Sequence, residues 1–152
     1  MAGFGFQAYQ KTDVITADPK KLVIMCYEGA IYSLKMAKAK FYAQEYEAKG
    51  KAIQNALDIL NELRAALDFE KGGEVARNLD SLYSFWTQHI LKADRQKDTR
   101  ALDQVAAMLE EIKSALEEAY YGQKDGQTIP LPFDKPAPRP AQESGRGFIL
   151  DR

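Results

Sequence analysis

Apolar residues recur every three to five positions along most of the chain, and this spacing is typical of α-helices that bury one face. We expect the first helix at 19–44, the second at about 47–69, the third at about 74–93 and a fourth after Asp98. Helices joined by such short connections pack against their sequence neighbours in antiparallel fashion. The pattern therefore predicts an all-α fold, an antiparallel four-helix bundle.

Local signals mark the ends of these helices. Asp18 can accept hydrogen bonds from the free amides of a first turn, and Pro19 suits the first helical position, where no amide hydrogen is needed. Asp98 predicts a similar start for the fourth helix. Gly72 and Gly73 favour a chain reversal between the second and third helices, because glycine readily adopts positive φ.

The composition divides the chain into three parts. Residues 1–18 form an arm rich in aromatic and small residues, and 19–121 form the helical bundle. Residues 122–152 contain five of the six prolines, so they cannot continue a helix and have little to bury. We expect this last part to be a flexible tail.

Charge and cysteine content narrow the class of protein. The net charge is −1 and the basic residues are scattered, which argues against a nucleic-acid binder. We expect neither a signal peptide nor membrane insertion, because the first residues lack a basic start and no apolar run is long enough. Cys26 is the only cysteine, so no internal disulfide can form. These features together predict a cytoplasmic protein.

The residues that could carry chemistry are few. The only histidine is His89, and the chain lacks a nucleophile elbow and a glycine-rich phosphate loop. A di-iron site in a bundle requires a second histidine. We therefore expect no catalytic residues, no metal and no cofactor, and hence no enzyme. One alternative is histidine phosphotransfer, because His89 is followed after three residues by Lys92 and then by Ala93.

The chain carries more apolar surface than four narrow stripes require. On the third helix, the predicted core stripe is Leu79, Leu82, Tyr83, Trp86 and Ile90. Phe85 and Leu91 fall outside that stripe, on opposite flanks. Surplus apolar surface on a soluble protein commonly marks an interaction site. From its residues alone, the chain is predicted to be a helical binding module.

Several linked motifs are similar to those of the FliS family. Residues 8–23 read AYQKTDVITADPKKLV, a tyrosine, a polar run, a valine and Thr-Ala-x-Pro before the first helix. Residues 25–31 read MCYEGAI, and 72–79 read GGEVARNL. The resemblance extends over about residues 8–120.

This resemblance implies a cytoplasmic export chaperone that binds the disordered C-terminal region of flagellin. Such a chaperone prevents premature polymerisation and presents its client to the flagellar export gate, and some family members bind an anti-sigma factor. In the family, an N-terminal lid can cover the binding groove, and our candidates for this lid are Tyr9 and Val14. The candidates for the flagellin-binding groove are Leu22, Met25, Tyr27, Leu79, Tyr83 and Trp86.

Overall fold

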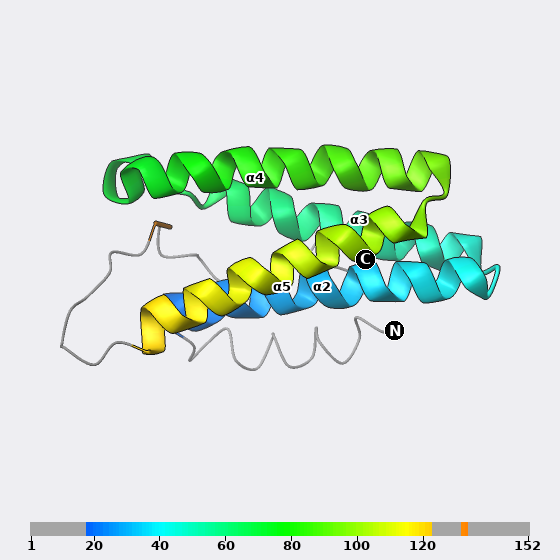
Figure 1. Cartoon of the computed structure of the whole chain (residues 1–152), viewed down its shortest axis with the longest axis horizontal. Helices are drawn as coiled ribbons and strands as arrows, with labels where there is room; N and C mark the ends of the chain where they lie inside the picture. Colours follow the sequence, from blue (N-terminus) through cyan, green and yellow to red (C-terminus); the bar gives the residue numbers. More distant parts are fainter. Residues whose placement is uncertain (1–17, 123–131, 134–152) are drawn as a thin grey trace.

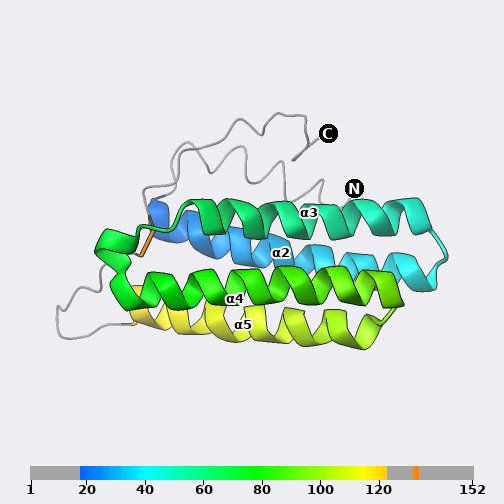
Figure 2. The ribbon, with the colours of Figure 1, turned by 90° about the horizontal axis from the view of Figure 1, so that it is seen from above.

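The computed structural model describes residues 18–122 and 132–133. Four long helices make up nearly all of this part of the chain, and Figures 1 and 2 show them side by side along the long axis. They are α2 (Pro19–Tyr42), α3 (Tyr46–Ala65), α4 (Phe69–Gln96) and α5 (Thr99–Tyr121). The prediction of an all-α four-helix bundle is confirmed.

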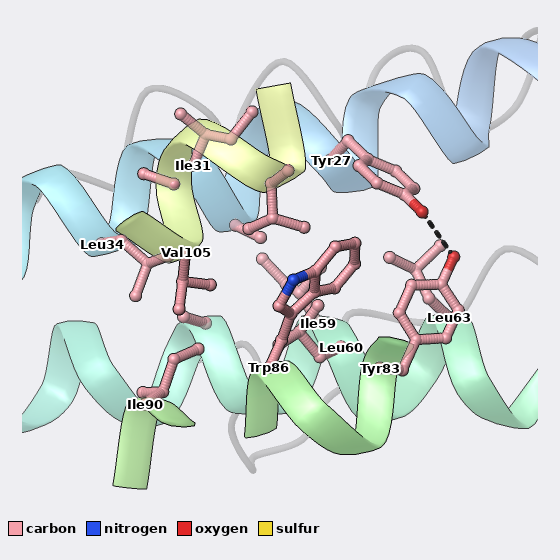
Figure 3. Close-up of a cluster of buried hydrophobic side chains, with 14 of the residues drawn as sticks. Tyr27, Ile31, Leu34, Ile59, Leu60, Leu63, Tyr83, Trp86, Ile90 and Val105 are labelled. Atoms are coloured by element: carbon pink, nitrogen blue, oxygen red, sulfur yellow. Dashed lines mark hydrogen bonds between the residues drawn. The ribbon is translucent and has the colours of Figure 1, made fainter. Parts of the chain in front are cut away.

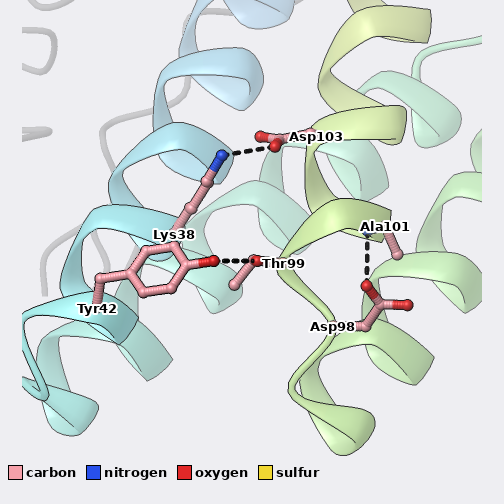
Figure 4. A network of polar contacts seen from close by, with 6 residues as sticks. All are labelled: Lys38, Tyr42, Asp98, Thr99, Ala101 and Asp103. Carbon is pink, nitrogen blue, oxygen red and sulfur yellow. Dashed lines mark hydrogen bonds and ion pairs between the residues drawn. The ribbon is translucent and has the colours of Figure 1, made fainter.

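The predicted starts of the first and fourth helices are also confirmed. An oxygen of the Asp18 carboxylate accepts a hydrogen bond from the Lys21 amide at 2.8 Å, and Pro19 occupies the first turn. At the start of α5, Asp98 accepts from the Ala101 amide at 3.1 Å (Figure 4). Each carboxylate satisfies an amide that would otherwise lack a partner within the helix.

The predicted boundary between the second and third helices is wrong by several residues. α3 ends at Ala65, and α4 begins at Phe69 rather than at residue 74. Asp68 is the reason, because its carboxylate accepts from the amides of Glu70 and Lys71 and starts the helix early. The chain reverses before the two glycines, and Gly73 (φ +50°) forms a kink inside α4 instead.

The helices are arranged so that α2 and α4 lie diagonally across the bundle, each packed against α3 and α5. The closest approach is between α2 and α3, where Ala30, Ala37 and Ala56 are fully buried. Small side chains let two helix backbones come close together. In the same interface, the Asn55 amide donates to the Ser33 hydroxyl at 2.6 Å.

Polar contacts connect the helices along the surface of the bundle. Between α2 and α5, Lys38 pairs with Asp103 at 2.6 Å, and the hydroxyls of Tyr42 and Thr99 lie 2.8 Å apart (Figure 4). Exposed ion pairs of this kind contribute little to stability, because water competes for both charged groups. The stability of the bundle therefore comes mainly from its apolar core.

Two residues of the predicted tail pack against the bundle where α3 meets α4. Phe133 has no exposed surface, and the Asp68 amide donates to the Pro132 carbonyl at 2.9 Å. Phe133 also forms an antiparallel bridge with Leu67. The other residues after Gly122 lie outside the described part of the chain, and the three-part division remains a prediction.

Candidate functional site

Three of the six predicted groove residues meet in the centre of the bundle. Figure 3 shows Tyr27 of α2 reaching across to Tyr83 of α4, with their hydroxyl oxygens 2.7 Å apart. Their ring centroids are separated by 6.3 Å, and those of Tyr83 and Trp86 by 5.7 Å. All three side chains are fully buried. They join the two diagonal helices that otherwise make few contacts with each other.

The other three predicted groove residues are buried as well. Leu79, one turn before Tyr83, belongs to the same apolar cluster. Leu22 and Met25 are buried on α2 but lie outside that cluster. The structure therefore brings four of the six residues into one core and places none on an open face. The role of the six residues in binding a client remains a prediction.

The predicted lid residues, Tyr9 and Val14, lie outside the described residues. Their role as a lid remains a prediction.

Burial changes the acid–base properties of the central hydroxyls. Loss of contact with water raises the pKa of Tyr27, and the hydrogen bond from Tyr83 offsets part of this rise. Burial likewise raises the pKa of Tyr83, with a further contribution from Tyr27. Burial also raises the pKa of Tyr120 to about 12. The neighbouring Cys26 thiol has its pKa raised to about 12 by burial and by the charge of Glu62.

These shifts predict that the bundle becomes less stable in alkali. A group with a raised pKa in the folded state loses its proton more readily when the chain unfolds, so its contribution disappears as pH rises. The free energy of unfolding should begin to fall near pH 9, where an unfolded cysteine ionises, and continue to fall up to about pH 12. Urea unfolding at several pH values would measure this.

A matched variant distinguishes the contribution of the Cys26 thiol to this pH dependence from that of the tyrosines. In Cys26→Ser, the fall should begin about one pH unit higher, near the ordinary tyrosine pKa of about 10. A free energy of unfolding that stays constant up to pH 11 would contradict the prediction.

Apolar side chains that are accessible lie mainly on the outside of the bundle. Large exposed hydrophobic residues are Tyr32, Tyr42, Tyr46, Phe69, Val75, Phe85, Leu91 and Tyr121. The sequence placed Phe85 and Leu91 outside the core stripe, and their exposed fractions of 50% and 39% agree with this. Phe85 is of particular interest because it lies beside other partly exposed groups.

We use the name outer seam for Leu82, Phe85 and His89 of α4 together with Gln104 and Met108 of α5. On each helix these residues are three or four positions apart and so share a face. His89 Nε2 lies 3.4 Å from Gln104 Oε1, which places the two faces next to each other. Leu82 and Met108 are partly buried and packed against the core. The outer seam is thus a partly accessible strip between two helices, apolar at Leu82, Phe85 and Met108.

Sequence reasoning identified only part of the outer seam. It placed Leu82 in the core stripe and did not single out Met108, whereas both are partly exposed. The feature of the sequence that could have identified Met108 is its four-residue spacing from Gln104, which puts both residues beside the buried stripe of α5. Periodicity shows that a helix has an apolar stripe. It does not show how much of that stripe a neighbouring helix covers.

His89 is packed into this seam. Its ring stacks on Phe85 with centroids 5.3 Å apart and an angle of 15° between the planes. With Gln104 beside Nε2, this arrangement is typical of a residue at the edge of a helix interface. Within residues 18–122 and 132–133, no three His, Cys, Asp or Glu side chains gather to hold a metal ion. In the same residues, no helix is long and apolar enough to cross a membrane.

Comparison with known proteins identifies the family. Residues 3–123 match the family described as "Flagellar protein FliS". The flagellar secretion chaperone FliS of Vibrio cholerae is 41% identical over 72% of this chain and 83% of its own length. Flagellar secretion chaperone FliSB of Pseudomonas aeruginosa is 36% identical over 68% and 82%, and FliS of Salmonella typhimurium is 35% identical over 73% and 86%. This agreement confirms the resemblance seen in the motifs and shows that the chain belongs to the FliS family of flagellar secretion chaperones.

Proposed function

We propose that this protein binds the C-terminal region of flagellin in the cytoplasm, prevents its premature polymerisation and delivers it to the flagellar export apparatus. The observation that carries the proposal is the similarity, over more than four fifths of their length, to relatives named flagellar secretion chaperones. The helical bundle with an accessible apolar strip supports it, because such strips accept the apolar face of an amphipathic helix.

The residues that could contact the client fall into two sets, which differ in how accessible they are in the folded bundle. The outer seam can receive a client helix without any change in the bundle, and Phe85 is its most exposed large side chain. Tyr27, Leu79, Tyr83 and Trp86 lie in the core of the bundle, so a client could reach these four only if α4 moved away from α2. That movement would break the hydrogen bond between Tyr27 and Tyr83. We therefore propose that the outer seam makes the first contact with the client.

The expected binding is coupled folding of a disordered segment. A client that becomes helical on the seam loses conformational entropy, which keeps its affinity moderate for the surface buried. Moderate affinity suits a chaperone that must release its client at the export apparatus. Tyr9 and Val14 remain our candidates for a lid that competes with the client.

Calorimetric titration with the C-terminal segment of flagellin from the same organism tests this proposal. We expect one segment to bind per chain with a negative change in heat capacity, the mark of buried apolar surface. Phe85→Ala should weaken binding about tenfold or more, as truncation of a central aromatic contact commonly does. Flagellin that fails to bind the wild-type protein would contradict the function.

Leu91→Ala is the matched control, because Leu91 is another exposed apolar residue of α4 but lies on the opposite flank. It should leave the affinity nearly unchanged. Equal losses in the two variants would place the client elsewhere than on the outer seam, without contradicting the chaperone function.

A further inference from the structure

The junction of α3 and α4 holds an aromatic side chain from a distant part of the sequence. We use the name α3–α4 corner for Leu67, Asp68, Gly72 and Ala76. Phe133 has no exposed surface and belongs to the same buried cluster as Leu67 and Ala76. Figures 1 and 2 show residues 132–133 beside the loop between α3 and α4. The corner is thus an apolar site for one aromatic residue.

The backbone of the corner adds recognition that does not depend on side chains. Residues 66–68 connect the two helices, and Asp68 has an extended conformation. Its amide donates to the Pro132 carbonyl at 2.9 Å, and Leu67 pairs with Phe133 in an antiparallel bridge. Pairing of an extended segment with the backbone of another segment is a common way for proteins to bind peptides.

Gly72 provides the space for the proline. A Cβ atom at this position would lie 2.9 Å from the Cβ of Pro132 and 3.0 Å from its Cα. It would also lie 2.7 Å from the Cβ of Ala76. These distances are shorter than carbon atoms normally tolerate, so a larger residue at position 72 would displace Pro132, Ala76 or both. The lack of a side chain at Gly72 therefore leaves the space that Pro132 occupies.

We propose that the α3–α4 corner is a peptide-binding site, separate from the outer seam, for an extended segment with a proline followed by an aromatic residue. Its three elements recognise different parts of such a segment. The apolar cluster accepts the aromatic ring, Gly72 admits the proline, and the backbone of residues 67–68 pairs with the main chain. Pro132 and Phe133 occupy the site from within the chain, and an unfolded partner segment with the same pair takes their place.

The covalent link between α5 and Pro132 determines how strongly the internal segment competes with a partner segment. Nine residues separate Gly122, where α5 ends, from Pro132. A link of this length gives the attached segment an effective concentration on the order of millimolar. A partner segment therefore binds the wild-type protein weakly and binds well only when the internal segment is weakened or carried away.

The first experiment uses full-length Phe133→Ala and a fluorescently labelled peptide of residues 128–136, followed by fluorescence anisotropy. The peptide should bind the variant at least tenfold more tightly than it binds the wild-type protein. A control peptide with alanine in place of its phenylalanine should not bind. Adding Gly72→Ala to the variant should also abolish binding. Equal binding to both proteins, or no binding to the folded variant, would overturn the proposal.

A second protein covers the case in which Phe133→Ala does not fold. A protease site placed within residues 123–131 allows the full chain to fold before it is cut. The cut segment should then exchange with the labelled peptide, at a rate and extent that depend on peptide concentration. A cut chain that stays folded, as judged by circular dichroism, and takes up no peptide would contradict the proposal.

Discussion

Replacing Trp86 by alanine should lower the free energy of unfolding by about 3–5 kcal/mol, the usual range for removal of a large buried aromatic side chain. Trp86 has no exposed surface and lies between Tyr83 and the apolar side chains of α2 and α3 (Figure 3). The surrounding side chains relax only partly into the cavity that is left, which adds to the loss. Urea unfolding followed by circular dichroism is the suitable measurement, because the variant lacks the only tryptophan.

Phe85 provides the matched control because it is the next residue back on the same helix. Half of its surface is exposed, so Phe85→Ala should change the free energy of unfolding by only about 0.5 kcal/mol. The two variants are therefore expected to change different properties. Trp86→Ala should lower the stability, and Phe85→Ala should lower the affinity for the client. A loss below about 1 kcal/mol for Trp86→Ala would contradict the central position of this ring.

The second large effect is expected from the buried tyrosine pair. Tyr83→Phe removes the hydrogen-bond partner of the Tyr27 hydroxyl while keeping the ring in place. A buried hydroxyl left without a partner destabilises the folded state by about 1–3 kcal/mol. The double variant Tyr27→Phe/Tyr83→Phe removes both hydroxyls, so its loss should be clearly smaller than the sum of the two single losses. Urea unfolding of all four proteins gives this comparison.

Tyr32→Phe is the control for loss of a tyrosine hydroxyl as such, because Tyr32 is 40% exposed and its hydroxyl can bind water. It should leave the free energy of unfolding nearly unchanged. Strictly additive losses in the Tyr27 and Tyr83 variants would show that the two hydroxyls do not stabilise one another, contrary to their 2.7 Å separation.

Features controlled by neighbouring residues were predictable from the sequence. Asp18 and Asp98 cap their helices as expected, because a cap depends only on the next three residues. The same logic applied at Asp68, but the two glycines at 72 and 73 gave a competing signal that favoured a later helix start. The structure satisfies both, with a cap at Asp68 and a kink at Gly73.

Features controlled by distant residues were not predictable. Periodicity shows that Tyr27, Tyr83 and Trp86 are apolar positions, but it cannot distinguish a groove from a core. That distinction depends on how closely α2 and α4 approach across the bundle. The burial of Phe133 was not predicted, because the prolines at 130, 132 and 136 interrupt any helical pattern around it. Its partners, Leu67 and Ala76, lie more than fifty positions earlier in the chain.

The position of Phe133 also has a consequence for how the protein is made. Chains emerge from the ribosome from the N-terminus onward, and their early parts can fold before synthesis is complete. All four helices are made before Phe133, yet the α3–α4 corner can close only after that residue has emerged. Until then the newly made bundle exposes the apolar surface and the backbone edge of the corner. Any folding of the four helices before that point leaves the corner without its aromatic side chain.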